Sequence, residues 1–469
     1  MTTRFHSIDP ATGETVWEGL EASRQDCAAA VARARAALPA WRAAPLAERI
    51  AVARRFAEAL DADREDFAAL ISRETGKLLW ETRAEIGSMI GKVAVSIVAQ
   101  AERAGTREAA TDFGRAVLRH RGHGVMAVLG PYNFPGHLPN GHIVPALLAG
   151  NCVVFKPSEI APATGERMAQ AWEKAGLPEG VLTLVQGGRE TGEALVAQDI
   201  DGLLFTGSAG AGRALKQATI DRPHLILALE LGGNNPLIVW DSPEHAASIV
   251  VQSAYVTTGQ RCSCARRLIV PEGKVGDAVV EAIDAMAGRL RVAAWDESGE
   301  AFMGPLASDA AARNAHAAVA RLEALGARVI RPFAGIAGRP EAFVTPALLD
   351  VTGIAAPDAE IFAPVLSVVR VPDFDAAVRA ANATSFGLSA GLVSNDAALW
   401  ARFVEESRAG IVNRNRPTTG AAANMPFGGL GASGNHRPSA YYAADYCAYP
   451  IGSFEADTVR EVAVPGRDA

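Results

Sequence analysis

The sequence has few of the features that mark secreted, membrane or nucleic-acid-binding proteins. Its five cysteines, at positions 27, 152, 262, 264 and 447, are an odd number in a chain of 469 residues, which argues against a disulfide framework. The first ten residues contain no apolar signal segment, and no stretch of about eighteen uninterrupted apolar residues follows. The net charge of −7 offers no basic face for nucleic acid. We therefore expect a cytoplasmic protein with no membrane and no nucleic-acid partner.

Motifs for metals and for redox pairs are missing as well. Cys262 and Cys264 are too close for a Cys-x-x-Cys pair, and no second ligand cluster accompanies them. We predict no metal site and a structural role for Cys264. No internal repeat or low-complexity linker divides the chain. Its composition, 49% hydrophobic and 21% charged, is typical of a soluble globular enzyme, and its length allows about three domains.

The chain does contain an alternation of helix and strand patterns. From Asp26 to about Gln100, charged and apolar residues recur at helical intervals. After Gly124, short β-branched runs predict strands at 125–129, 152–155, 181–185, 203–205, 225–229 and 237–240, separated by helix-length stretches. Further strands are expected at 268–270, 328–330 and 365–371, before a loop-rich tail at 413–434. This pattern predicts an α/β fold with parallel sheets, in a layout of dinucleotide-binding type.

Two residues could together make and hydrolyse a thioester. Cys262 lies in the segment GQRCSC (259–264), and the lone acid Glu230 lies upstream in LELGGNNP (229–236). The positive charges of Arg261 and Arg266 predict a lowered pKa for the Cys262 thiol. An apolar strand end predicts a raised pKa for Glu230. The alternative is that Cys262 is a small buried core residue, as unpaired cysteines often are.

Three turns that follow predicted strands could hold a nucleotide and an oxyanion. The glycine-rich segment FTGSAGAG (205–212) precedes a helix, so its amides could approach a pyrophosphate, although it lacks G-x-G-x-x-G and could be glycine-rich for steric reasons alone. Lys156 and Glu159 in KPSE could bind ribose hydroxyls, or simply form a polar strand end. A carboxylate there would repel a 2′-phosphate, which favours NAD over NADP. In PYNFP (131–135), Asn133 could face an oxyanion or only form a turn.

The ordered motifs PYNFP, KPSE, FTGS, ELGGNNP, GQRCSC, EIFAPV and PFGGLGASG resemble the aldehyde dehydrogenase superfamily over nearly the whole chain. The resemblance implies two Rossmann-like parallel-sheet domains and a small β oligomerisation element. The NAD-binding domain would comprise residues 1–107 and 124–230, the catalytic domain residues 231–432, and the oligomerisation element residues 108–123 and 433–469. It also implies a homo-oligomer that hydrolyses its acyl intermediate rather than passing it to coenzyme A.

The same resemblance implies a role for each matching residue. Cys262 would be the nucleophile and Glu230 the general base, while Asn133 and the backbone N–H of Cys262 would form the oxyanion hole. The implied cofactor-binding residues are Lys156, Ser158, Glu159, Gly207, Ser208, Ala209, Gly210, Ala211, Gly212, Leu231, Gly232, Glu360 and Phe362.

Residues 260–268 and 431–450 indicate the substrate. They resemble the N-succinylglutamate 5-semialdehyde dehydrogenase branch of the superfamily, whose enzymes act in arginine catabolism. The resemblance implies a small anionic semialdehyde, for which Arg261, Phe134, His436 and Arg437 are the candidate contacts. Pro438 stands where many relatives have an acid, and Arg414 where an aromatic residue is usual in this branch. Other semialdehydes or aminoaldehydes, of the succinic, glutaric or γ-aminobutyraldehyde type, are alternatives. Two alternative functions are that of a catalytically silent relative and that of an esterase that uses the same thiol.

Overall fold

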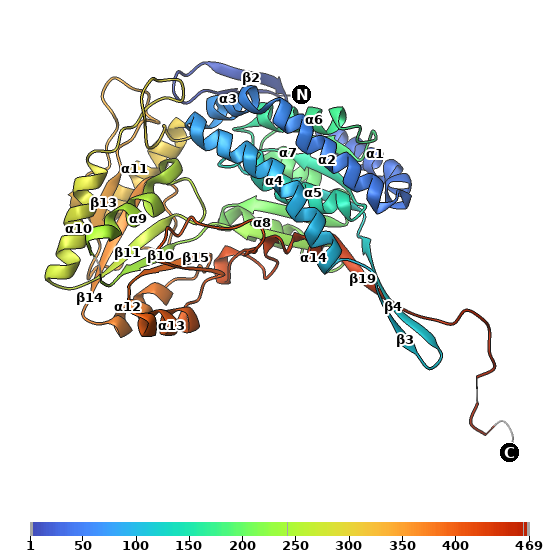
Figure 1. The fold of residues 1–469 in the computed structure, drawn as a ribbon. Coiled ribbons are helices and arrows are strands. Elements are labelled where there is room, and N and C mark those ends of the chain that lie inside the picture. The colour runs from blue at the N-terminus through green and yellow to red at the C-terminus, as the bar shows by residue number, and fades with distance from the viewer. Residues whose placement is uncertain (1–2, 242, 463, 467–469) are drawn as a thin grey trace.

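A computed structural model describes residues 3–241, 243–462 and 464–466, which form two lobes and a projecting arm (Figure 1). The first lobe contains a five-stranded parallel sheet in the order β7-β6-β5-β8-β9. Its strands are β5 (Val125–Leu129), β6 (Cys152–Lys156), β7 (Leu182–Leu184), β8 (Gly202–Gly207) and β9 (Ile226–Leu231). Every residue of β5 and β6 is buried, as expected when helices cover both faces of a parallel sheet.

Eight helices surround this sheet. They are α1 (Arg24–Ala43), α2 (Leu46–Ala62), α3 (Arg64–Thr75), α4 (Leu79–Arg103), α5 (His137–Leu148), α6 (Pro162–Lys174), α7 (Arg189–Val196) and α8 (Ala209–Ala218). Among the described helices, only α4 is long and apolar enough to cross a membrane by length and composition. It packs against α2, α3 and α5 and buries Ile86, Met89 and Val93, so its apolar composition is explained by its place in the core.

The strand order creates a crevice beside β5. The chain first adds β6 and β7 on one side of β5, and then places β8 and β9 on the other side. The segments that follow β5 and β8 therefore leave in opposite directions, which opens a crevice at the carboxyl ends of the two strands. Asn133 follows β5 and Ser208 follows β8, so both lie at this crevice.

The second lobe contains a seven-stranded sheet in the order β12-β13-β14-β11-β10-β15-β16, parallel except for β12. Its strands are β10 (Asn235–Val239), β11 (Ala265–Pro271), β12 (Arg328–Arg331), β13 (Ala347–Asp350), β14 (Val365–Val371), β15 (Ser389–Val393) and β16 (Ile411–Arg414). Its helices are α9 (Pro243–Tyr255), α10 (Lys274–Ala287), α11 (Asp309–Ala324), α12 (Phe374–Asn382) and α13 (Ala397–Glu406). Cys262 precedes β11 and Glu360 precedes β14. Because these two strands are parallel neighbours, both residues lie at the same edge of the sheet.

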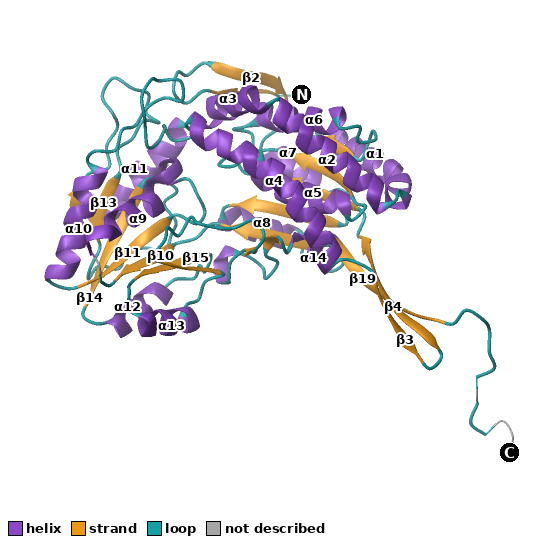
Figure 2. Cartoon of the chain, in the orientation of Figure 1, coloured by secondary structure: helices purple, strands orange, loops and turns teal. Residues whose placement is uncertain are grey.

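The arm is a three-stranded antiparallel sheet in the order β19-β4-β3 that projects away from both lobes (Figures 1 and 2). It consists of β3 (Arg107–Thr111), β4 (Gly114–Gly122) and β19 (Ala448–Glu455). The remaining elements are the hairpin β1 (Arg4–Ile8) and β2 (Thr15–Leu20), the pair β17 (Pro426–Phe427) and β18 (Ser439–Ala440), helix α14 (Ala443–Cys447), and the short turns η1 (Val256–Gly259) and η2 (Gly431–Ser433).

All the strands predicted from sequence are present, but several others were not predicted. These are β13, β15, β16, the pair of β17 and β18, and the hairpin of β1 and β2. The segment predicted as a loop-rich tail begins inside β16 and contains β17. The prediction relied on β-branched runs, whereas β15 begins with Ser389, Ala390 and Gly391. Small residues are suitable there because β15 is buried between β10 and β16.

Candidate active site

A left-handed turn precedes Cys262. Thr257, Thr258 and Gly259 have φ values of 56°, 54° and 69°, a conformation that costs a non-glycine residue roughly 1–2 kcal/mol. Hydrogen bonds hold the turn, from the hydroxyl of Thr257 to Glu81 and from that of Thr258 to the carbonyl of Gly304. A Cβ atom on Gly259 would lie 2.2 Å from the carbonyl oxygen of Ala363, so only glycine fits this close approach. The surrounding structure thus fixes the path of the chain into Cys262.

The segment ELGGNNP is tied to the cysteine loop through Asn235. Its side-chain amide donates hydrogen bonds to the carbonyls of Cys262 and Cys264, at 2.7 and 2.8 Å. Cys262 is partly exposed, whereas Cys264 is buried and its thiol faces the carbonyl of Val256. The structure therefore presents Cys262 to a ligand and encloses Cys264 in the protein.

The prediction of a lowered thiol pKa is wrong for this state of the protein. Burial, followed by the charges of Glu360 and Glu230, raises the pKa of Cys262 to about 12. The charge of Arg266 lowers this pKa by less than burial and the carboxylates raise it, since its guanidinium lies 3.1 Å from Glu360. Arg261 donates to the Thr257 hydroxyl instead. Adjacency of the two arginines in sequence is therefore not enough to lower the pKa of the thiol.

Glu230 lies at the end of β9 and is buried. One carboxyl oxygen accepts a hydrogen bond from the backbone N–H of Ser439 at 3.2 Å, and the other has no partner among the described residues. Burial raises the pKa of Glu230 well above its ordinary value, in the predicted direction. A carboxyl group with one free oxygen and a raised pKa is suited to accept a proton from water.

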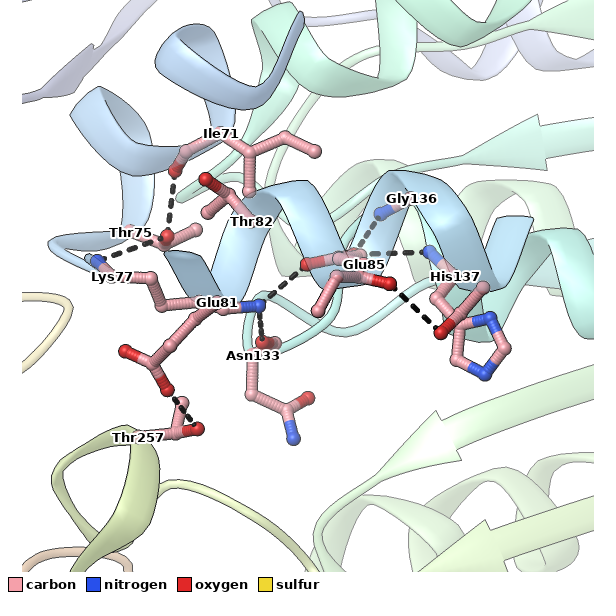
Figure 3. A network of polar contacts seen from close by, with 12 residues as sticks. Ile71, Thr75, Lys77, Glu81, Thr82, Glu85, Asn133, Gly136, His137 and Thr257 are labelled. Carbon is pink, nitrogen blue, oxygen red and sulfur yellow. Dashed lines mark hydrogen bonds and ion pairs between the residues drawn. The ribbon is translucent and has the colours of Figure 1, made fainter. Parts of the chain in front are cut away.

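A buried ionic network positions the loop that carries Asn133 (Figure 3). Lys77 forms an ion pair with Glu85 and donates a hydrogen bond to the carbonyl of Asn133 at 3.0 Å. Glu85 in turn accepts hydrogen bonds from the backbone N–H groups of Gly136 and His137, each at 3.0 Å. The loop is therefore anchored at both ends, which limits how far Asn133 can move.

The amide of Asn133 is oriented by the cysteine loop itself. It donates to the carbonyl of Gln260 at 3.0 Å. An amide NH₂ group has two donors, and one hydrogen bond leaves the second for another acceptor. Asn133, Glu230 and Cys262 all line one cleft, so the structure brings together the three predicted catalytic side chains.

This cleft, which we call the nucleotide-side cleft, has a volume of about 550 Å³ and lies between the two lobes. The predicted cofactor residues that line it are Glu159, Gly207, Ser208, Ala209, Leu231, Gly232, Glu360 and Phe362. The predicted residues that do not line it are Lys156, Ser158, Gly210, Ala211 and Gly212. Lys156 is buried at the end of β6, with Nζ donating to the carbonyl of Pro157 and lying 3.9 Å from Glu159.

The glycines of the cleft act partly through packing. A Cβ on Gly212 would lie 2.6 Å from the Leu231 side chain, and one on Gly232 would lie 1.8 Å from Glu360. Ser208 caps α8 by accepting a hydrogen bond from the N–H of Ala211. The first-turn amides have no acceptor within the helix, so this end of α8 suits a pyrophosphate. Acidic groups suited to ribose hydroxyls and an anion-binding helix end thus face one cleft, which fits a dinucleotide.

A second cavity, the substrate-side cavity, has a volume of about 360 Å³ and also includes Cys262. Its walls come from α4, α5 and residues 419–423, and it contains the predicted residues Phe134 and Arg261. Sequence reasoning missed Lys92, which lines the same cavity. A signal was present, because Lys92 is the sole charged residue between Glu85 and Glu102 in an apolar helix.

His436 and Arg437 do not line the substrate-side cavity. They line a separate cavity of about 160 Å³ with Glu230, and neither residue is in contact with the substrate-side cavity. The side chain of Asn435 accepts a hydrogen bond from the N–H of Leu229 and donates one to the carbonyl of Leu227, which holds this segment along β9. The structure therefore does not bring His436 and Arg437 to the substrate-side cavity, and their contact with substrate stays a prediction.

Arg414 also lies outside the substrate-side cavity. Its guanidinium donates to the carbonyls of Ser394 and Asn395, and it stacks near the Trp400 ring. The departure at Arg414 from the aromatic residue usual in the branch therefore does not alter the walls of that cavity.

Comparisons with known proteins agree with this geometry. The sequence profile of the aldehyde dehydrogenase family matches residues 1–449. The N-succinylglutamate 5-semialdehyde dehydrogenase 2 of Caulobacter vibrioides is 61% identical, over 97% of this chain and 95% of the relative. The N-succinylglutamate 5-semialdehyde dehydrogenase of Salmonella heidelberg is 50% identical, over 99% and 96%. The crystal structure of an NAD-dependent aldehyde dehydrogenase from Sinorhizobium meliloti superposes with a TM-score of 0.92 at 28% identity, covering 98% of this chain and 93% of that one.

Proposed function

The chain belongs to the aldehyde dehydrogenase family, and we propose that it oxidises N-succinyl-L-glutamate 5-semialdehyde to N-succinyl-L-glutamate with NAD, in arginine catabolism. The observation that carries the substrate assignment is the charge of the substrate-side cavity. It is lined by the cations Lys92 and Arg261 and by no Asp or Glu among the described residues. Such a cavity favours an aldehyde that bears carboxylates.

The first step is attack of the Cys262 sulfur on the aldehyde carbon. Because the pKa of the thiol is about 12 in the free protein, its proton must be removed as the bond forms. The Cys262 side chain is partly exposed, so the proton can pass to water in the cleft, and Glu230 keeps its free oxygen for the last step. The carbonyl oxygen becomes an oxyanion, which the second N–H of Asn133 and the backbone N–H of Cys262 stabilise. Loss of one such donor costs about 3 kcal/mol.

When bound, NAD would supply the hydride acceptor that this oxidation needs, and loss of the hydride would leave the acyl group on Cys262 as a thioester. Glu159, Ser208 and the first turn of α8 would hold the nucleotide, and Glu360 with Phe362 would border its nicotinamide end. The carboxylate of Glu159, beside the end of β6, supports NAD over NADP because it would repel a 2′-phosphate.

The last step is hydrolysis of the thioester. Glu230 takes a proton from water, the resulting hydroxide attacks the acyl carbon, and the thiolate of Cys262 leaves. The acid product departs, and Glu230 returns its proton to the thiolate of Cys262, which restores both groups. The cavity that contains His436 and Arg437 is also lined by Glu230 and provides room for water beside the carboxyl group.

Assembly is a separate part of the proposal. The arm of β3, β4 and β19 carries exposed aromatic side chains, Phe113 and Phe454, whose rings lie 5.9 Å apart. Exposed apolar side chains on a sheet with a free edge are suited to contact with another copy of the chain. We propose a homo-oligomer assembled through this arm, in the cytoplasm, where free cysteines remain reduced. Light scattering of the protein with and without Phe454→Ser tests the interface, and an unchanged molar mass would contradict it.

A panel of aldehydes tests the substrate. N-succinylglutamate semialdehyde, succinic semialdehyde, γ-aminobutyraldehyde and butanal are compared by NADH absorbance at equal enzyme concentration. We expect N-succinylglutamate semialdehyde to have the highest kcat/KM and the cationic aminoaldehyde the lowest. If N-succinylglutamate semialdehyde ranks no higher than butanal, the substrate assignment is wrong. A higher kcat/KM with NADP than with NAD would contradict the role of Glu159.

A further inference from the structure

Lys92 is a buried cation without a partner. Its side chain is 2% exposed, and among the described residues it has no hydrogen bond or ion pair. It lies on α4 with Ser88, Gly91 and Val95, a spacing that places all four on one face of the helix. That face forms a wall of the substrate-side cavity. The Lys92 side chain extends toward α5, where its Cε would lie 3.8 Å from a Cβ on Gly141.

The titratable groups around Lys92 do not neutralise it. From α5, His137 and His142 face it, and burial, followed by the Lys92 charge, lowers their pKa values to about 4 and about 3. Both are therefore neutral at pH 7. From α14, Cys447 faces Lys92, and burial raises the pKa of this thiol far above its ordinary range. Burial lowers the pKa of Lys92 to about 8, so the ammonium group remains mostly protonated at pH 7.

We propose that Lys92 binds a carboxylate of the substrate and so sets the preference of the enzyme for anionic aldehydes. A buried ammonium group without a partner costs free energy, and a carboxylate would remove that cost by supplying the missing acceptors. A lysine with a purely structural role would have an acid or several carbonyls as partners, as Lys77 has in Glu85 and Asn133. This inference rests on the proposed function and names the residue that determines its specificity.

The cavity also matches the number of charges on the substrate. N-succinylglutamate semialdehyde carries two carboxylates, and the cavity carries two cations, Lys92 on α4 and Arg261 on the cysteine loop. Arg261 is partly compensated by Glu81, at 3.7 Å, whereas Lys92 is not compensated. Phe134 and Leu138 lie in the same cavity and can pack against the hydrocarbon of the substrate. Lys92 is thus the more available of the two charges.

Kinetics of matched variants test the inference. Lys92→Met keeps the length of the side chain without its charge, Lys92→Arg keeps the charge, and Lys174→Met removes an exposed lysine at the end of α6. The readout is the ratio of kcat/KM for N-succinylglutamate semialdehyde to kcat/KM for butanal. We expect Lys92→Met to lower this ratio roughly 10- to 100-fold, mainly through KM. We expect Lys92→Arg to recover part of it, and Lys174→Met to leave it at the wild-type value.

Thermal unfolding separates ligand binding from a structural role. We expect Lys92→Met to raise the Tm of the free protein, because it removes a buried unpaired charge. We also expect the variant to lose most of the Tm increase that the product N-succinyl-L-glutamate gives the wild type. A structural lysine would instead give a lower Tm and an equal loss of kcat/KM for both aldehydes, which would overturn the inference.

The two proposals fail in different ways. If the wild-type enzyme does not prefer N-succinylglutamate semialdehyde to butanal, the proposed function fails, whatever Lys92 does. If the wild type has that preference and Lys92→Met retains it, the proposed function stands and the role of Lys92 is refuted.

Discussion

The nucleotide-side cleft and the substrate-side cavity meet at Cys262, and they differ in charge and in construction. The cleft is lined by four carboxylates, Glu159, Glu230, Asp358 and Glu360, and by no Lys, Arg or His among the described residues. The cavity has the opposite character, with Lys92 and Arg261 and no carboxylate. The acidic cleft suits the ribose hydroxyls of a nucleotide, and the cationic cavity suits an anionic aldehyde. The two reactants of one oxidation would thus be bound by regions of opposite charge.

The two regions are also built from different elements. The cleft is formed by segments at the ends of β5, β8 and β9 and at the starts of β11 and β14, where the backbone is held by two sheets. The cavity is formed by faces of α4 and α5 and by residues 419–423. Strand ends fix the groups common to every aldehyde oxidation, whereas side chains on helices can change without moving those groups. Substrate preference is therefore separable from chemistry in this fold.

Replacing the residue that both regions share should have the largest effect. Cys262→Ala removes the nucleophile, so we expect NADH formation to fall by about four orders of magnitude or more, with every aldehyde of the panel. The acyl-enzyme should also be undetectable by mass spectrometry. Cys264→Ala is the matched control, because this buried thiol lies two residues away, and it should retain turnover within about tenfold. Retained turnover by Cys262→Ala would remove the nucleophile from the mechanism.

Glu230→Gln should split the reaction at the thioester. We expect an initial burst of NADH, followed by steady turnover that is roughly 10²- to 10⁴-fold slower, because water lacks its base. Rapid mixing with the anionic aldehyde measures both phases. Hydroxylamine cleaves thioesters without a base, and its addition should restore part of the steady rate. A variant with no burst would place Glu230 in the first step rather than only the last.

The charge difference predicts how stability depends on pH. Because the pKa of Lys92 is about 8 in the folded protein and 10.5 in the unfolded chain, only the unfolded chain binds this proton between those values. Stability from this group therefore rises as pH increases from about 8 to 10.5. Below pH 8 the buried charge destabilises the protein by on the order of 3 kcal/mol. In urea unfolding, the free energy of unfolding of Lys92→Met should exceed that of the wild type most at pH 7. This difference in free energy should shrink toward pH 10. A constant difference would contradict burial of the charge.

Burial, followed by the carboxylates of the cleft, should suppress the reactivity of Cys262 when no ligand is bound. With a thiol pKa of about 12, alkylation by iodoacetamide should rise about tenfold per pH unit from pH 7 to 10, without a plateau. Glu360 is the neighbouring charge that raises the pKa of Cys262 most. Glu360→Gln removes it and should speed alkylation roughly 3- to 10-fold at fixed pH. Glu405→Gln, an exposed acid on α13, should have no effect. Peptide mapping assigns the label to Cys262.

Much of the cleft was predictable because its residues follow or precede strands within short motifs. The positions of Asn133 and Glu230 follow from the rule that ligands bind at the carboxyl ends of parallel strands. Cys262 precedes β11 and was predicted from its own motif instead. The cavity was less predictable, because its walls meet only in the folded chain. Lys92 belongs to a helix whose apolar pattern indicates a core. Its lone charge is visible in the sequence, but that charge does not show that one face of the helix borders a cavity.

Charge interactions were the hardest feature to predict from sequence. Arg261 and Arg266 flank Cys262 along the chain, yet their guanidinium groups are engaged by Thr257 and Glu360. His436 and Arg437 were predicted to contact the substrate, but they line a separate cavity with Glu230. Glu360 lies 94 residues from Arg266 along the chain. Thr257 is only four residues before Arg261, but it belongs to a left-handed turn that no motif in the sequence indicates. Contacts of this kind depend on the folded path of the chain.

The wall of α4 has a consequence for the design of reagents. Ser88 and Gly91 line the substrate-side cavity and are also exposed at the molecular surface, so this wall leads from Lys92 outward to solvent. A dye or resin linker attached to the succinyl end of a substrate analogue could leave the protein along this path while its carboxylate stays beside Lys92. Affinity capture of the enzyme from crude extracts would then need no fused tag.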